Sequence, residues 1–137
     1  MLLLAGPRFT LRKTGDTFWL TYREAHCWLG VLYGEQGRLD EAIPELQAAL
    51  RINPNSADAH FNLGGVYYRQ GHLDEAIREY QAVRRINPND AGAHLNLGGV
   101  YYQQGRIDEA IHEYRAALRI NPNNADAHFN LGKVYIE

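Results

Sequence analysis

Histidine recurs in this sequence every 34 residues, at His26, His60, His94 and His128. Imidazole is a common zinc ligand, so a regular series of histidines raises the hypothesis of a metal site. Packed helices lie about 8 to 10 Å apart, whereas two ligands of one zinc ion each lie about 2 Å from it. The spacing therefore predicts that these histidines take part in helix packing, and it predicts no metal ion and no cofactor.

Asparagine recurs with the same spacing, at Asn62, Asn96 and Asn130. A carboxamide presents a donor and an acceptor together, so a series of them could pair with the amides of an extended peptide without reading its side chains. The alternative is that these asparagines bond within their own repeat or to water. The sequence shows no nucleophile and base pair, no glycine-rich phosphate loop and no paired carboxylates at a useful spacing, so we expect no enzyme.

The 34-residue spacing belongs to the whole chain beyond a non-repeat segment at residues 1–22. Residues 57–90 and 91–124 share 24 identical residues in 34 positions, and residues 23–56 align with both at lower similarity. A partial copy follows at residues 125–137. A fixed period of this length is typical of a helical repeat array, in which stacked units share one core.

Each unit reads as two helices. In the second unit the first helix carries apolar residues at helical spacing and ends at Gly71, and the second begins near Asp74, a predicted N-cap, and ends at Asn87 and Pro88. Small residues recur where two helices must approach closely, at Gly30, Gly64, Gly98 and Gly132 in the first helices and at Ala42, Ala76 and Ala110 in the second. Glycine inside a helix costs about 1 kcal/mol relative to alanine, so close packing is the expected compensation.

A 34-residue unit that carries "NLGGVYY", then "DEAI", then tyrosine, then "INPN" resembles the tetratricopeptide repeat. The resemblance covers residues 23–137 and recurs in phase. It implies an all-α fold, a right-handed superhelix of antiparallel helix pairs in which the first helices line the concave surface. The function that it implies is a non-enzymatic scaffold for protein interaction, with a peptide or protein segment bound in the concave groove.

The resemblance also assigns one arc of each first helix to the groove. The residues so assigned are the three asparagines, the apolar Phe61, Leu95 and Phe129, the tyrosines Tyr68 and Tyr102, and the charged Asp58 and Arg69. A similar asparagine series is found in the repeat domain of O-linked N-acetylglucosamine transferases, although this chain is too short for their catalytic domain.

Members that bind chaperone tails grip a carboxylate with lysine and arginine on this surface. The corresponding positions here are Cys27, Val31, Gly92 and Asn96, and only Asn62 fits. With Glu24, Asp58 and Asp126 nearby, a neutral or basic segment is therefore expected rather than an acidic tail.

The composition excludes other classes of partner. A formal charge of -2 and a pI near 6.3 give no general attraction for nucleic acid, and RNA-reading helical repeats need a basic groove.

The apolar run at the N-terminus is too short for a signal peptide or a membrane span. With a single cysteine, Cys27, which we expect to be a small buried side chain, the chain is expected to be cytoplasmic.

The two ends depart from the repeat. Residues 8–22 could form a hairpin around Gly15 and Asp16, or the first helix could extend back through Phe18, Trp19 and Tyr22. We favour the extended helix and expect these aromatic residues to cover the first unit.

At the other end, Leu131, Val134 and Tyr135 lack a second helix and predict a self-association edge. The alternative function is therefore a self-assembly module, as a homodimer or a higher homo-oligomer.

Overall fold

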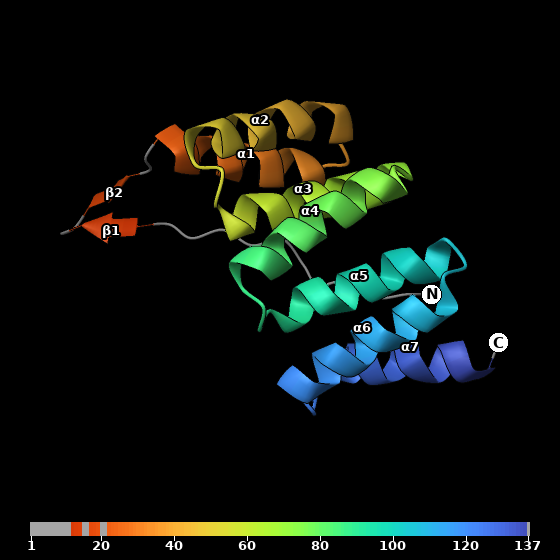
Figure 1. Ribbon diagram of the computed structural model, residues 1–137. Helices are drawn as coiled ribbons and strands as arrows, with labels where there is room; N and C mark the ends of the chain where they lie inside the picture. Colours follow the sequence, from red (N-terminus) through yellow and green to blue (C-terminus); the bar gives the residue numbers. More distant parts are fainter. Residues whose placement is uncertain (1–11, 15–16, 20–21, 137) are drawn as a thin grey trace.

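The computed structural model describes residues 12–14, 17–19 and 22–136. The elements are β1 (Arg12–Thr14), β2 (Thr17–Trp19), α1 (Tyr22–Glu35), α2 (Leu39–Ile52), α3 (Ala57–Gln70), α4 (Leu73–Ile86), α5 (Ala91–Gln103), α6 (Ile107–Ile120) and α7 (Ala125–Ile136). In Figure 1 the pairs α1–α2, α3–α4 and α5–α6 follow one another, and α7 closes the series. The expected all-α array of antiparallel helix pairs is confirmed.

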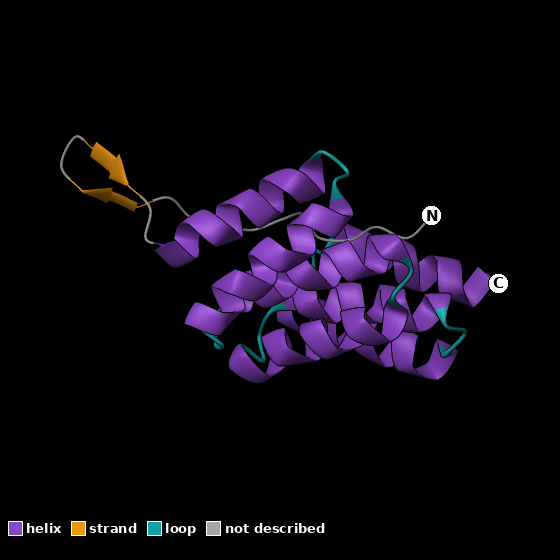
Figure 2. Ribbon diagram, turned by 90° about the horizontal axis from the view of Figure 1, so that it is seen from above, coloured by secondary structure: helices purple, strands orange, loops and turns teal. Residues whose placement is uncertain are grey.

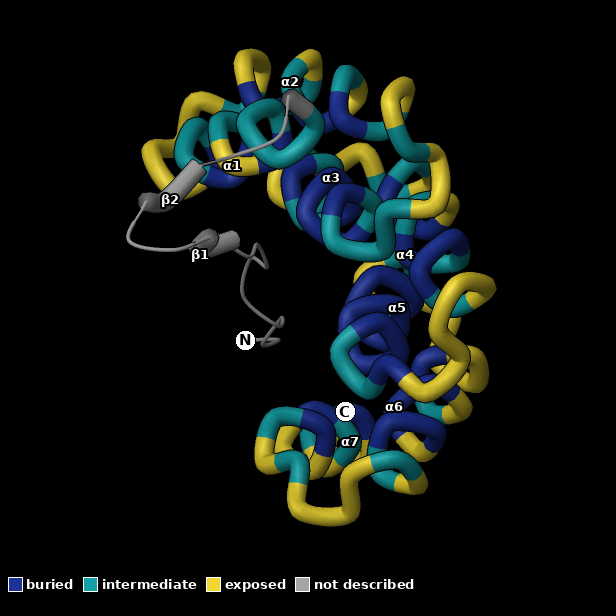
Figure 3. Tube along the Cα trace, turned by 90° about the vertical axis from the view of Figure 1, so that its left-hand side faces the viewer, coloured by how far each residue is buried: buried dark blue, intermediate teal, exposed yellow. Residues whose placement is uncertain are grey.

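The helix pairs are stacked along an arc. Figure 3 shows α3, α5 and α7 on the inner side of this arc, with α4 and α6 on the outer side. Each second helix packs against its own first helix and against the first helix of the following unit. The buried residues form two core clusters, one in the first and second units and one from the second unit onward, and Tyr67 packs against both. None of the helices described is long and apolar enough to cross a membrane.

The N-terminal segment contains a hairpin, and the favoured helix extension is wrong. β1 and β2 pair antiparallel, with Arg12 opposite Trp19 and Thr14 opposite Thr17. α1 begins only at Tyr22. Threonine is a poor helix former and a good strand former, so two short runs that contain it pair across the intervening residues 15 and 16. Figure 2 shows the two strands lying away from the stacked helices. The expectation that the aromatic residues Phe18, Trp19 and Tyr22 cover the first unit concerns side chains that lie outside the described part of the structure.

Within each pair, a glycine of the first helix lies against a large side chain of the second. A Cβ added to Gly98 would lie 2.5 Å from Cε1 of Tyr114, one added to Gly64 would lie 2.9 Å from Cε1 of Tyr80, and one added to Gly30 would lie 2.5 Å from Cγ of Leu46. Both tyrosine rings and the leucine are completely buried. The close packing predicted from the small residues is thus confirmed at Gly30, Gly64 and Gly98, whereas nothing lies within 4 Å of a Cβ added to Gly132.

The helix ends follow from local chemistry. The first helices of the second, third and fourth units are capped by Ser56, Asp90 and Asn124, whose side-chain oxygens each accept a backbone N–H bond three residues later. Gly71 follows α3 with a φ of 80°, as expected for a left-handed cap. Asp74 is not an N-cap: α4 begins at Leu73, so Asp74 lies in the first turn.

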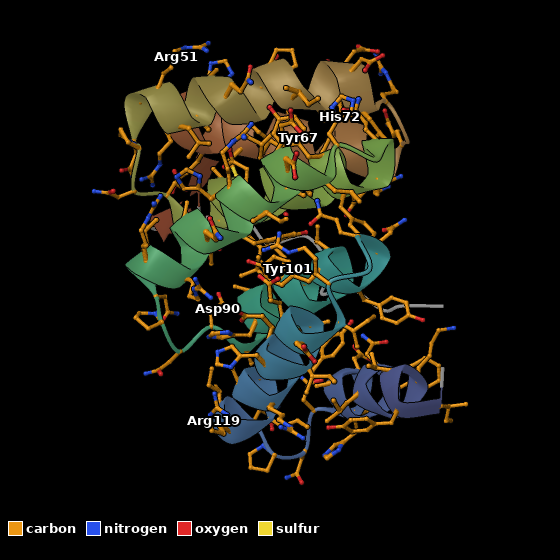
Figure 4. All side chains as sticks on the ribbon, turned by 45° about the vertical axis from the view of Figure 1, so that its right-hand side comes forward. Arg51, Tyr67, His72, Asp90, Tyr101 and Arg119 are labelled. Carbon is orange, nitrogen blue, oxygen red and sulfur yellow. The ribbon has the colours of Figure 1, made fainter. Side chains whose placement is uncertain are left out.

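Successive units are joined by a repeated polar contact between the second helix of one unit and the first helix of the next. Gln47 donates to the Tyr67 hydroxyl (3.3 Å) and Gln81 donates to the Tyr101 hydroxyl (3.4 Å). Figure 4 shows Tyr67 and Tyr101 at two successive boundaries between helix pairs. Because both contacts use the same repeat positions, they support one geometry of stacking along the array.

The glycine contacts predict opposite effects for two alanine substitutions. Gly98→Ala should lower the free energy of unfolding by about 1 to 3 kcal/mol, because the methyl group meets the Tyr114 ring. Gly132→Ala should raise it by up to about 1 kcal/mol, because nothing lies within 4 Å of the added atom and alanine favours the helix. Urea unfolding followed by circular dichroism measures both. Equal effects at the two positions would contradict this packing.

Candidate functional site

The histidine series forms a repeated polar link inside each helix pair. The Nδ1 atoms of His26, His60 and His94 lie 2.5, 2.6 and 2.6 Å from carboxylate oxygens of the second helices. The glutamates are Glu45, Glu79 and Glu113, each 19 residues after its histidine. The predicted role in helix packing is therefore confirmed for His26, His60 and His94, whereas His128 is exposed. No group of three potential metal-binding side chains was found among the described residues.

The second ring nitrogen determines the protonation of the pair. Nε2 of His60 lies 2.8 Å from the Pro54 carbonyl oxygen, and Nε2 of His94 lies 3.1 Å from that of Pro88. A carbonyl only accepts, so Nε2 carries a proton, and a second proton must then lie between Nδ1 and the carboxylate. The imidazolium form satisfies both contacts, and the hydrogen bond to glutamate raises the pKa of His60 and of His94.

The link is most enclosed in the third unit. Glu113 is only 3% exposed, and it accepts a second bond from Arg84 of the preceding unit, at 2.7 Å. A carboxylate is rarely this buried unless it is paired, and Glu113 has two basic partners. The missed signal was the constant spacing of 19 residues between histidine and glutamate in three successive units.

The asparagine series lies inside the structure and does not line an open surface. Asn62, Asn96 and Asn130 are 6, 1 and 0% exposed. Nδ2 of Asn62 donates to the Asp58 carbonyl one turn earlier, and its side chain also bonds to Cys27 of the preceding unit. The expected exposure of the series is thus wrong. The alternative of bonds within the repeat agrees with the bond from Asn62 to Asp58, whereas Cys27 belongs to the preceding unit.

Cys27 is itself 9% exposed, as expected for a small buried side chain. Burial, followed by the negative charge of Asp58, raises the pKa of the Cys27 thiol to about 11. The thiol is therefore protonated at neutral pH.

The apolar residues assigned to the groove divide into covered and accessible positions. Phe61 and Leu95 are each 2% exposed, and the Phe61 ring packs edge-on against Tyr80 with 5.8 Å between centroids. Their predicted exposure is wrong: Phe61 is covered by Tyr80, which belongs to the second helix of the same unit. Phe129, at the same position in the last unit, is 53% exposed, and Tyr68 and Tyr102 remain half-buried.

The two charged residues assigned to the groove also differ. Asp58 is partly exposed in the first turn of α3. Arg69 is exposed, but its guanidinium donates to the Gly34 carbonyl at 2.5 Å, near the C-terminal end of α1. The positively charged guanidinium of Arg69 therefore lies at the negative end of the dipole of α1.

The predicted self-association edge is partly buried. Val134 is 7% exposed and belongs to the core, and Leu131 is partly buried against the same core. Tyr135 is 57% exposed, and its hydroxyl accepts a bond of 2.6 Å from Arg115 of α6. The choice of Val134 is wrong, because this side of α7 faces the preceding unit. The open side of α7 instead carries Phe129 and Ile136.

The arc of helix pairs with recurring glycine and histidine contacts defines a helical repeat protein. Models of the tetratricopeptide repeat match residues 27–91 and 70–114, and a TPR repeat model matches residues 98–137. The three matches together span residues 27–137, and the chain belongs to the tetratricopeptide repeat family.

Solved structures show the same fold. One is described as the first TPR of Spaghetti (RPAP3) bound to the HSP90 peptide SRMEEVD; it has a TM-score of 0.80 at 23% identity and covers 83% of this chain and 90% of that chain. A second, the crystal structure of MamA, has a TM-score of 0.80 at 29% identity and covers 84% of this chain and 67% of that chain. A comparison with curated proteins gave no match. Membership of the tetratricopeptide repeat family supports a role as a protein-interaction scaffold.

The histidine pairs predict that stability falls as the pH rises. Because the folded-state pKa of His60 and of His94 is raised, their contribution is fully present below the unfolded pKa of about 6.5 and is lost as the pH rises through the folded values. We expect the free energy of unfolding to decrease above pH 6.5, and Glu79→Gln with Glu113→Gln to flatten this decrease. Urea titrations between pH 5.5 and 8.5 measure it, with the exposed His112→Gln as control. An increase of stability over this range would contradict the assignment.

Proposed function

We propose that the chain is a non-enzymatic scaffold that holds a peptide or protein segment against the inner side of its arc. The observation that carries the proposal is the pair of half-buried tyrosines, Tyr68 and Tyr102, at the same repeat position in α3 and α5. Both helices lie on the inner side in Figure 3. Tyrosine offers a large apolar surface with one polar atom, which suits a binding surface that stays in water when it is empty.

These tyrosines belong to one surface that runs across two units. Burial raises the pKa of Tyr114, and Tyr68 of the preceding unit adds to this effect, so the two phenols lie near each other. Tyr68 and Tyr102 also pack against the same core cluster. An extended segment that crosses from α3 to α5 would therefore meet aromatic side chains fixed from below, and fixed side chains lose little entropy on binding.

The charges favour a neutral or basic segment. The first of the two solved structures is bound to SRMEEVD, a peptide that contains two glutamates and an aspartate. In this chain the positions that would hold a carboxylate are Cys27, Val31, Gly92, Asn62 and Asn96, and Arg69 already bonds the Gly34 carbonyl. Partly exposed Glu24, Asp58 and Asp126 add negative charge to the inner helices, which opposes an acidic ligand.

Peptide selection tests the proposal. We expect 12-residue peptides selected from a random display library on the immobilised chain to be poor in acidic residues. Their affinity should fall about tenfold or more for Tyr68→Ala with Tyr102→Ala, as for aromatic hot spots. Arg78→Ala, whose side chain is exposed on α4, serves as the control. Peptides that bind the double variant as well as the parent would contradict the inner surface as the site.

Self-association is the second candidate function, because Phe129 and Ile136 of α7 are 53 and 88% exposed. Exposed apolar side chains that adjoin one another favour association. If this function is correct, light scattering coupled to size exclusion should show a mass that grows with concentration for the intact chain, and a monomer for Phe129→Asp with Ile136→Lys. A monomer for both chains over a hundredfold concentration range would remove this candidate.

A further inference from the structure

The C-terminal ends of all three second helices carry the same sequence, Arg-Ile-Asn-Pro-Asn, which begins at Arg51, Arg85 and Arg119. The three arginines are exposed, and Ile52 and Ile86 beside them are 48 and 39% exposed. Figure 4 shows Arg51 of the first unit and Arg119 of the third unit on the same side of the array. We call the arginines and isoleucines at positions 51, 52, 85, 86, 119 and 120 the Arg-Ile edge.

The arginines of this edge lack partners. In the part of the chain that the structure describes, no hydrogen bond or ion pair holds Arg51, Arg85 or Arg119. All the other exposed arginines in that part have a partner, namely Arg38, Arg69, Arg78, Arg106 and Arg115. A place in the last turn of a helix suits the helix dipole, but that role needs only a cation and leaves the guanidinium groups available to a ligand.

A groove of about 570 Å³ lies beside Arg119, between the α4–α5 turn and the C-terminal half of α6. Its lining residues are Pro88, Asn89, His94, Ala116, Arg119 and Ile120, none of which is acidic. The same six residue types recur one unit earlier, at Pro54, Asn55, His60, Ala82, Arg85 and Ile86. The array therefore carries this set of residues twice, around Arg85 and around Arg119.

The base of the groove is charged as well as its rim. His94 is 9% exposed, and its imidazolium is held between the Pro88 carbonyl and Glu113. Glu113 also accepts a bond from Arg84, so two cations share one carboxylate. This group keeps one net positive charge, and Arg119 adds a second at the rim. The groove therefore attracts anions.

We propose that the Arg-Ile edge binds an extended acidic segment of another protein. A carboxylate of this segment occupies the groove and pairs with the Arg119 guanidinium, whose planar fork matches the two carboxylate oxygens. An adjoining apolar side chain packs on Ile120 and Pro88, and the segment continues to Arg85 and Ile86. The preference for acid distinguishes this edge from the inner surface proposed above, so either proposal can fail without the other.

Nucleic acid is a poorer occupant of this edge. Binding to its backbone relies on many cations, whereas this chain has a formal net charge of -2. The groove is lined by no phenylalanine, tyrosine or tryptophan on which a base could stack. A carboxylate beside an apolar side chain, by contrast, matches the arginine and the isoleucine of each unit.

Peptides selected on a chain without the inner-surface tyrosines provide the probe. Random 12-residue peptides are selected by display on the chain with Tyr68→Ala and Tyr102→Ala, and we expect them to be rich in aspartate and glutamate next to apolar residues. A selected peptide is then synthesised with a fluorophore, and its binding to the unaltered chain is followed by fluorescence anisotropy. Arg85→Ala with Arg119→Ala should weaken this binding about tenfold or more, because charge-assisted bonds are lost.

Two controls separate this site from a general effect of charge. Arg38→Ala with Arg106→Ala removes the same charge from two other exposed arginines and should leave the affinity unchanged. Glutamine in place of the acidic residues of the peptide should weaken binding to the unaltered chain, a result that does not depend on the fold of any chain variant.

Four results would overturn the proposal. They are selected peptides poor in acidic residues, undiminished binding to the Arg85→Ala with Arg119→Ala chain, an equal loss for both arginine pairs, and undiminished binding of the glutamine peptide. Displacement of the peptide by a single-stranded RNA of similar length, at a comparable concentration, would assign the edge to nucleic acid and would also overturn it.

Discussion

The close approach of a first helix to the second helix of its unit is the contact on which the rest of this structure depends. It requires a glycine where the large side chain of the second helix arrives, and Gly30, Gly64 and Gly98 meet that requirement with Leu46, Tyr80 and Tyr114. The buried rings then form the centre of a core that continues from one unit to the next. Because each unit shares its core with its neighbours, the curvature of the arc and the inner surface follow from this packing.

The histidine and glutamate pairs add a directional contact to an otherwise apolar interface. The histidine ring is held on one side by a proline carbonyl and on the other by a proton that it shares with the glutamate. Because the glutamate must reach this proton, the contact fixes the rotation of the second helix about its own axis. Removal of one member of a buried ion pair leaves the other without compensation, so the pairs favour this register over others. His94 is buried and His60 is partly buried, each against a glutamate of its second helix, whereas His128 is exposed.

The sequence predicted the helices, their pairing, the glycine contacts and the repeat family, because these depend on a period that survives in every copy. It did not predict which groove residues are covered. The rotation of a helix places Phe61 and Asn62 on one arc, but contacts with other helices, such as that of Phe61 with Tyr80 of α4, decide whether that arc meets solvent. The sequence also failed to predict the structure of the N-terminal segment. Its aromatic residues suit either a helix or a strand, and the preference of the neighbouring threonines for strands favours the hairpin.

Native-state hydrogen exchange is the measurement that tests the central claim most directly. α3 and α7 share ten of twelve residues over 57–68 and 125–136, but in the described part of the chain a second helix lies against the glycine of α3 and not against that of α7. If the packing of the second helix stabilises the first, amides in the middle of α7 should open with a free energy several kcal/mol below that of the same positions in α3, since the middle of α3 is enclosed on both sides. Equal protection of the two helices would show that their stability comes from elsewhere and would contradict this account.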